Sequence, residues 1–217
     1  MQRVSPAACS RRNRDHPMRS RMYVVSSMRR LSLALALAPA LACVRHRPPE
    51  VATAPAVLPN GIEPGTPRAL LYARSLMVPV HGVRPDQVAN SFDAGRGSRQ
   101  HNALDLPAPR GTPVVAADAG RILRLANSAS GGISLYQLDP EQRFVYYYAH
   151  LDRFRSGLRA GMEVAQGEVL GYVGTSGNAP PDLPHLHFQV MLYRPGRYWE
   201  GEPLNPFGLF VRPGQAR

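Results

Sequence analysis

The segment His185–Leu192 most restricts the fold of this chain, because polar and apolar residues alternate along it. A period of two is typical of a β-strand that buries one face and exposes the other. The apolar set is Leu186, Phe188, Val190 and Leu192, and the opposite set is His185, His187, Gln189 and Met191. If the apolar set packs into a core, both histidines point together toward solvent or a cleft. Such a pair suits a metal site, or a metal ligand beside a proton-transfer group. The competing interpretation is a surface strand with two incidental histidines.

The rest of the chain after Met77 also indicates β-structure. Short runs of Val, Ile, Leu and Tyr are separated by turns that contain Gly, Pro and Asp, which predicts a mainly β domain built as an antiparallel sheet or sandwich. Residues 69–76 are predicted to form a short helix or an ordered segment leading into the domain, and residues 199–210 an irregular tail. The expected strands are Leu76–Pro79, Pro113–Ala116, Gly120–Ala126, Ile133–Leu138, Phe144–His150, Val169–Val173 and His185–Leu192.

A weak internal repeat is consistent with such an architecture. Residues 111–120 and 161–171 share a rhythm of Gly and Val that is similar to the one in lipoyl and biotinyl carrier modules. Those carriers attach their cofactor to a lysine, and this chain contains no lysine. A related architecture is therefore expected, and a carrier function is excluded.

The net charge of +11 is concentrated at the N-terminus. Residues 1–42 hold eight Arg and one acidic residue, whereas residues 43–217 hold 18 Arg and 14 acidic residues. A nucleic-acid-binding domain would carry its basic excess on a folded face. This distribution argues against nucleic acid as a partner.

Residues 1–42 are predicted to be an N-terminal extension that ends in an export signal. Residues 28–42 combine a basic start, an apolar stretch and a small-residue ending, as export signals do. Cys43 directly follows the predicted cut, which resembles a bacterial lipoprotein signal with a lipidated cysteine. The alternative is ordinary secretion with a free Cys43. Residues 43–68, rich in Pro and Ala, are predicted to be a tether, and residues 69–217 the folded domain.

His101 and Asp105 form a second group of candidate metal ligands. Four residues apart in an extended or gently turning segment, the two side chains are expected to face the same way. Zinc accepts mixed imidazole and carboxylate ligands, and a catalytic zinc site typically has three protein ligands and one position for water. His101 and Asp105 with either His185 or His187 would supply those three.

A third element is the aromatic run that ends at His150. Alternation along a predicted strand places Tyr146, Tyr148 and His150 on one face. The run is interpreted either as an aromatic strand capped by a histidine, or as a strand that brings a histidine beside a metal-bound water.

Taken in order, these motifs resemble the lysostaphin/LytM-type zinc endopeptidases of bacterial cell walls. The resemblance covers roughly residues 77–210. It rests on His101-x-x-x-Asp105, Tyr148-Ala-His150-Leu, Gly161-x-x-Val-x-x-Gly-x-x-x-Gly171, Gly174-Thr-Ser-Gly177 and Pro184-His-Leu-His-Phe188. It implies that His101, Asp105 and His187 bind one zinc ion. It also implies that His150 and His185 serve the catalytic water and the transition state.

The chain departs from the family pattern at three places. Ala103 and Gln189 stand where the family often has Gly and Glu, and the loop Asn178–Pro184 is longer and richer in proline. None of these departures replaces a ligand, so they bear on substrate specificity more than on activity.

The resemblance implies an exported zinc metalloendopeptidase, periplasmic or otherwise in the cell envelope, that hydrolyses peptide bonds in peptidoglycan stem peptides or crosslinks. It implies a groove in the β domain with the metal at its floor. Zinc would lower the pKa of a bound water from ~15.7 toward ~7. One of His150 and His185 would move the proton, and the other would stabilise the oxyanion.

The alternative from another class is a non-catalytic wall-binding regulator that activates a cell-wall amidase. Such a binding module has no need of all five site residues, so their retention argues against it. The sequence also lacks the His-Glu-x-x-His and Gly-x-Ser-x-Gly motifs, and it has no cysteine after position 43. Other common hydrolase chemistries therefore have no basis here.

Overall fold

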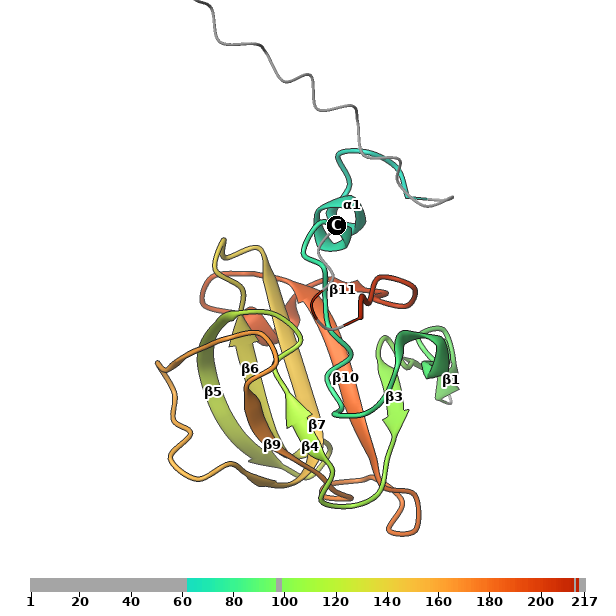
Figure 1. Ribbon diagram of the computed structural model, residues 1–217, viewed down its shortest axis with the longest axis vertical. Helices are drawn as coiled ribbons and strands as arrows, with labels where there is room; N and C mark the ends of the chain where they lie inside the picture. Colours follow the sequence, from blue (N-terminus) through green and yellow to red (C-terminus); the bar gives the residue numbers. More distant parts are fainter. Residues whose placement is uncertain (1–61, 97–98, 213, 215–217) are drawn as a thin grey trace, which may run out of the picture. The chain divides into compact units, whose positions relative to one another are not determined.

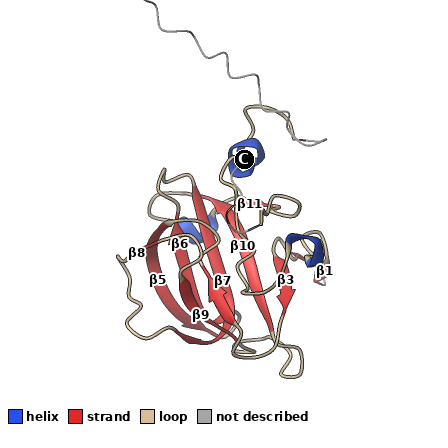
Figure 2. Ribbon diagram, viewed as in Figure 1, coloured by secondary structure: helices blue, strands red, loops and turns tan. Residues whose placement is uncertain are grey.

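The structure is a computed structural model that describes residues 62–96, 99–212 and 214 (Figure 1). The predicted export signal, Cys43 and most of the predicted tether lie outside the described residues. Within the described part the chain is mainly antiparallel β-structure, as the sequence predicts (Figure 2). The strands are β1 (Gly95–Arg96), β2 (Arg99–Gln100), β3 (Leu104–Pro107), β4 (Pro113–Val115), β5 (Gly120–Ser128), β6 (Gly132–Leu138), β7 (Phe144–Phe154), β8 (Glu163–Val164), β9 (Val169–Val173), β10 (His185–Leu192) and β11 (Pro203–Leu204).

In the part of the chain that is described, nine of these strands form one sheet, and β1 and β2 form a separate pair. The main path through the sheet is β11-β10-β7-β6-β5-β8. The first half of β10 pairs with β3, and residues 190–191 pair with β11. Most of β7 pairs with β6 and β10, whereas Leu151–Phe154 pairs with β9, which itself pairs with β4. β7 therefore exchanges one set of partners for another near its end.

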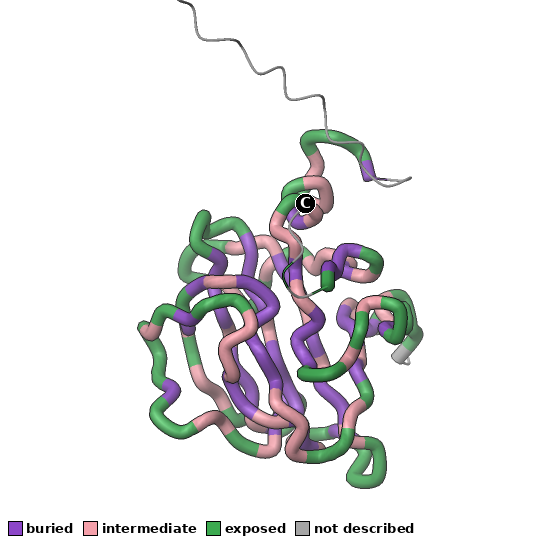
Figure 3. The backbone as a smooth tube through the Cα atoms, in the orientation of Figure 1, coloured by how far each residue is buried: buried purple, intermediate pink, exposed green. Residues whose placement is uncertain are grey.

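β10 has the predicted bounds, and its apolar face is buried as predicted. Leu186, Phe188 and Val190 are fully buried. They belong to the main core, which also contains residues of β4, β6, β7 and β9, and buried segments run along the central strands in Figure 3. Burying a side chain of this size contributes about 1.5–3 kcal/mol. The core thus holds the opposite face of β10, with its histidines, in a fixed position.

Helical structure is scarce in the described residues. The helix α1 (Pro67–Tyr72) has Thr66 as its N-cap, whose hydroxyl accepts the N–H of Ala69, an arrangement that stabilises a helix start. Two 3₁₀ helices follow, η1 (Pro85–Gln87) and η2 (Tyr198–Glu200). Nowhere in the described ranges is a helix long and apolar enough to cross a membrane.

Some strands differ from the sequence-based expectation. The expected strand Leu76–Pro79 instead makes isolated bridges nearby, such as Met77 with Val211. β7 continues to Phe154, beyond its expected end at His150. The sequence pattern does not predict the short strands β1, β2, β3, β8 and β11, because two to four residues show no clear period. β4 is equally short, but its run of Val and Ala predicts a strand.

β7 is kinked at His150, which has a φ of 61°. This is the left-handed region, which non-glycine residues rarely occupy, and it breaks the alternation of side chains. Tyr146 and Tyr148 are buried in the core. The His150 ring instead lies 5.5 Å from the ring of His187, on the opposite face of the sheet. The prediction that the two tyrosines and His150 share one face is therefore wrong.

The hydroxyl of Tyr148 is satisfied within the core and does not reach the site. It donates to Gln137 at 2.7 Å and accepts the N–H of Ala117 at 3.0 Å. Gln137 donates in turn to the carbonyl of Asp118 at 2.7 Å, and the Asp118 carboxylate accepts the hydroxyl of Tyr146 at 2.8 Å. These bonds satisfy the polar ends of both tyrosines, as burial requires.

Candidate metal centre

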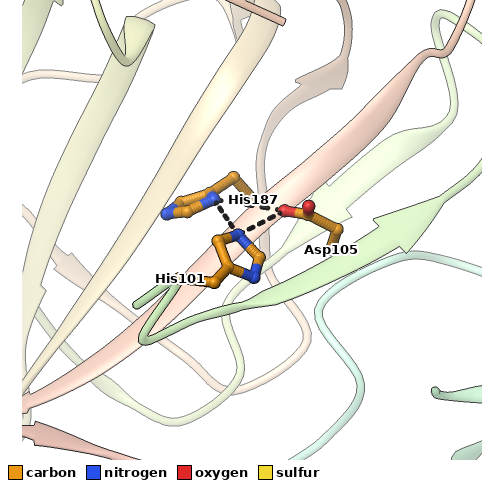
Figure 4. A group of neighbouring side chains, drawn as sticks. All are labelled: His101, Asp105 and His187. Carbon is orange, nitrogen blue, oxygen red and sulfur yellow. Dashed lines mark hydrogen bonds and ion pairs between the residues drawn. The ribbon is translucent and has the colours of Figure 1, made fainter. Parts of the chain in front are cut away.

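Three side chains converge on one point: His101 from the segment before β3, Asp105 from β3, and His187 from β10. Figure 4 shows them pointing toward one another. His101 Nε2 lies 3.0 Å from Asp105 Oδ1 and 3.0 Å from His187 Nδ1. His187 Nδ1 lies 3.1 Å from Asp105 Oδ1. Asp105 and His187 are direct partners in the β3–β10 register, which explains why β10 presents His187 to this group.

The chain turns between His101 and Asp105 rather than running extended. Asn102 has a φ of 56°, a left-handed conformation that Asn tolerates better than most residues, and β3 begins only at Leu104. The two side chains meet as expected, but the turn brings them together and the even spacing of a strand does not. Ser91 braces this turn, because its hydroxyl accepts the N–H of Asp105 at 2.9 Å.

Main-chain carbonyls determine which nitrogen of each imidazole is available. Nδ1 of three rings donates to a carbonyl at 2.8 Å: His101 to Ser91, His150 to Ser176, and His185 to Leu183. Because a carbonyl oxygen only accepts, Nδ1 carries the proton, and Nε2 of the neutral ring carries a lone pair. No sequence pattern predicts these carbonyl partners, because every residue has a carbonyl.

Asp105 is the anion of this group. Burial raises its pKa, but protonated His101 and His187 rings beside it would outweigh burial and hold the pKa far below its ordinary value. The carboxyl group is therefore ionised at neutral pH and needs a positive charge nearby.

The donor set fits zinc. Zinc takes imidazole nitrogens and carboxylate oxygens at about 2.0–2.2 Å, and tetrahedral ligands at that length lie about 3.3 Å from one another. The three donor atoms here are 3.0–3.1 Å apart. With neutral rings, the lone pair of His101 Nε2 faces an oxygen of Asp105 with no proton between them. A cation bound between these donor atoms would remove the repulsion between the nitrogen lone pair and the carboxylate oxygen.

His150 and His185 lie beside the triangle formed by His101, Asp105 and His187. The ring centroids of His150 and His185 are 5.0 Å apart. Burial lowers the pKa of His150 to about 4, although its hydrogen bond to the Ser176 carbonyl acts in the other direction. Nε2 of His185 is buried without a hydrogen-bond partner in the described structure, 3.7 Å from Asp105 Oδ1. Both rings therefore offer a basic nitrogen next to the candidate metal site.

Two cavities share His150 as a lining residue. The larger has a volume of about 590 Å³ and is also lined by Asp105 and His185. The smaller, of about 160 Å³, is also lined by His101 and His187. Each of the five side chains therefore lines at least one of the two cavities.

A close contact between the start of β6 and the loop that connects β9 to β10 holds Ser176, the partner of His150, in place. The Ser176 hydroxyl donates to the carbonyl of Leu151 at 2.6 Å, next to His150 on β7. Gly132 has a φ of 59°, and a Cβ on it would lie 2.3 Å from the main chain of Ser176. In the sequence, the motif Gly174-Thr-Ser-Gly177 is the feature that indicates this close contact, since backbones approach this closely only where glycine is present.

Gly132→Ala is expected to lower the free energy of unfolding by about 2–4 kcal/mol, because the new methyl group meets Ser176 and the left-handed backbone becomes strained. Urea denaturation measures this change. Gly95→Ala is the matched control, since a Cβ there has open space around it, and a change within about 0.5 kcal/mol is expected. Equal midpoints for the two variants would contradict the close contact.

The sequence also matches a known protein family. The model of the family described as "Peptidase family M23" matches residues 99–206. An L-Ala--D-Glu endopeptidase of Bacillus subtilis (strain 168) is 31% identical over 112 residues, which are 49% of this chain and 34% of that protein. A DD-carboxypeptidase/endopeptidase Mpg of Neisseria meningitidis serogroup B (strain ATCC 13091 / M2091) is 32% identical over 111 residues, 51% of this chain and 23% of that protein. The chain spans only about a quarter to a third of these relatives.

Among solved structures, a zinc-containing peptidase from Vibrio cholerae has the same fold. The TM-score is 0.50 at 23% identity, over 62% of this chain and 40% of that chain. The fold class predicted from the sequence is confirmed.

Proposed function

This chain carries a peptidase family M23 domain over residues 99–206, and on this premise we propose that it is an exported zinc metalloendopeptidase of peptidoglycan. The observation that carries the proposal is the convergence of His101, Asp105 and His187 beside two further imidazoles, those of His150 and His185. Metal-dependent hydrolases combine a group of metal ligands with neighbouring side chains that accept and donate a proton.

In this proposal His101, Asp105 and His187 hold one zinc ion. Zinc, when bound, supplies a Lewis acid and lowers the pKa of a water molecule. Only Asp105 is charged among the three ligands, so the ligand set offsets one of the two positive charges of the ion. The Ser91 carbonyl keeps Nε2 of His101 deprotonated and directed at the site, as orienting partners of metal-binding histidines do.

His150 and His185 are proposed to move the proton. Their Nδ1 atoms are committed to the carbonyls of Ser176 and Leu183, so Nε2 is the atom that accepts a proton from the attacking water and returns it to the leaving amine. A ring that has gained this proton can stabilise the negative charge on the substrate oxygen. Burial, which lowers the pKa of His150 to about 4, keeps this ring unprotonated at neutral pH, as an acceptor must be.

Peptidoglycan is proposed as the substrate because both relatives described above are named as peptidases, one for an L-Ala--D-Glu bond and one as a DD-carboxypeptidase/endopeptidase. The two names describe different bonds, so the proposal covers stem peptides and crosslinks as a class. Residues 43–217 keep a modest positive charge, with 18 Arg and 14 acidic residues, which also favours approach to an anionic wall.

Peptidoglycan lies outside the cytoplasmic membrane, so a hydrolase of it has to be exported. We propose residues 1–42 as an extension with an export signal, residues 43–68 as a tether, and residues 69–217 as the zinc peptidase domain. We also propose Cys43 as the site of a lipid anchor in the cell envelope. Mass spectrometry of the N-terminal peptide from membrane-associated protein tests this anchor, and an unacylated Cys43 would exclude it.

Metal removal tests the enzymatic proposal directly. Purified protein is expected to contain about one zinc ion per chain and to change the muropeptide profile of purified peptidoglycan. Chelation should abolish the change, and added zinc should restore it. Chromatography of the muropeptides and elemental analysis of the protein are the measurements. Digestion that persists without metal would contradict the zinc mechanism. An unchanged profile with zinc-loaded protein would favour a non-catalytic regulator of a cell-wall amidase.

A further inference from the structure

The larger cavity beside the candidate metal centre has mostly apolar walls. They come from the end of β3 with the residues after it and from the loop 178–184, and their apolar members include Pro107, Ala108, Pro109, Ala179, Pro180 and Leu183. A further side is formed by Asp105, His150 and His185. A group that enters the cavity therefore lies directly beside the reaction centre.

The loop 178–184 that forms one wall is held in shape. Pro180, Pro181 and Pro184 each fix a backbone φ angle. The N–H of Leu183 donates to the Pro180 carbonyl at 3.2 Å, and the Leu183 carbonyl accepts Nδ1–H of His185 at 2.8 Å. The wall is thus preorganised and tied to a residue of the site, which lowers the entropy lost on binding.

The charge of the cavity is opposite to that of the chain. The sequence has 26 cationic and 15 acidic residues, yet the residues described as lining this cavity include two Asp and no Arg. Asp105 is engaged with the two imidazoles of the triangle. The guanidinium of Arg110, which follows one wall in the sequence, is paired with Asp152 at 2.7 Å.

Asp182 is the remaining charge at this cavity. Its side chain is exposed, and no hydrogen bond or ion pair to any other described residue engages its carboxylate. An apolar cavity with one available carboxylate suits a ligand that is an aliphatic chain ending in a cation, because the walls favour methylene groups and the carboxylate favours positive charge.

We infer that this cavity is a specificity subsite for a substrate residue whose aliphatic side chain ends in an ammonium group, with Asp182 as the partner of the ammonium. The inference rests on the proposed function and names the substrate class of the same site. A diamino acid of the stem peptide has this chemistry. A glycine or alanine would place at most one methyl group against the apolar walls, and an anionic side chain would meet Asp182 with like charge.

Cross-linked muropeptide dimers provide matched substrates for a test. Acetic anhydride acetylates their free side-chain amines, which removes the positive charge and keeps the aliphatic chain. For the zinc-loaded wild-type protein, acetylation is expected to raise KM about two- to fivefold with little change in kcat, as loss of an exposed ion pair predicts. Asp182→Asn should raise KM for the native dimer by a similar factor and make the enzyme indifferent to acetylation.

Asp86→Asn is the matched control, because Asp86 is exposed and does not line this cavity. It should keep the wild-type KM for both dimers. Equal KM values of the wild type for native and acetylated dimers, or a preference that survives Asp182→Asn, would overturn the ammonium subsite while hydrolysis still upholds the proposed function. If the zinc-loaded wild type cleaves neither the dimers nor intact peptidoglycan, the proposed function itself fails.

Discussion

His187→Ala should abolish zinc binding and lower peptidoglycan hydrolysis by more than about 10³-fold. His187 Nδ1 contacts both other members of the triangle, His101 Nε2 at 3.0 Å and Asp105 Oδ1 at 3.1 Å. Its loss leaves two donors, fewer than the three protein ligands of a typical catalytic zinc site. The fold should survive, because the main core lies on the other face of β10. Elemental analysis, muropeptide release and the thermal midpoint measure these three effects.

His81→Ala is the control for this prediction. His81 is exposed and does not belong to the metal-ligand group, so its removal should change neither zinc content nor hydrolysis. A His187→Ala protein that retains one zinc ion per chain would show that the metal is held elsewhere. A variant that loses zinc and still hydrolyses the wall would refute a metal-dependent reaction.

His150→Ala should keep zinc and lower kcat by about 10²–10⁴-fold, the contribution of a positioned acid–base group. His150→Gly should lose as much activity, yet be more stable than His150→Ala by about 1 kcal/mol. The reason is the φ of 61° at this position, which strains any residue that has a Cβ and leaves glycine unstrained. Kinetics, zinc content and urea denaturation of the two variants provide the comparison.

Each outcome for these two variants has a distinct meaning. Retained turnover in His150→Ala would remove His150 from proton transfer, and loss of zinc would make it a ligand. Equal stability of the Ala and Gly variants would show that the backbone at this position is not strained. The predicted pattern, in which the variants match in activity and differ in stability, would separate the role of the side chain from that of the main chain.

The regular parts of this fold could be predicted from the sequence because their signal is local. In His185–Leu192 the apolar residues stand at every even-numbered position, which identifies the face that is buried. The strand runs through this segment without a break. Val169–Val173 likewise has the predicted bounds. The residues alone grouped His101 and Asp105 with either His185 or His187, and the family resemblance selected His187. The structure brings His101, Asp105 and His187 together. Their roles as ligands stay a prediction that the substitutions above test.

The errors occur where the backbone leaves a regular conformation. Periodicity assumes extended φ angles, so it placed His150 on the face of Tyr148, whereas the left-handed kink turns the ring to the other side. Asn102 interrupts the segment before β3 in the same way. The contacts of Ser91 with His101 and of Ser176 with His150 could not be predicted either, because both come from main-chain carbonyls, and every residue has a carbonyl.

The carbonyl partners of the imidazoles have a consequence for how the site tolerates mutation. The groups that orient His101, His150 and His185 belong to the peptide backbone, so no side-chain substitution at positions 91, 176 and 183 removes an orienting oxygen atom. At positions 91 and 176 the side-chain hydroxyl acts indirectly, because its hydrogen bonds hold the local main chain in position. Alanine scanning would therefore underestimate how much the main chain at these positions contributes to the orientation of the histidines. Changes that move the main chain, such as insertions, prolines, replacement of the glycines around residue 176 or loss of these hydroxyl bonds, alter the protonation pattern of the site. Evolution can accordingly vary the chemistry of the loop surface, and with it the substrate, while the tautomers of the histidines remain protected.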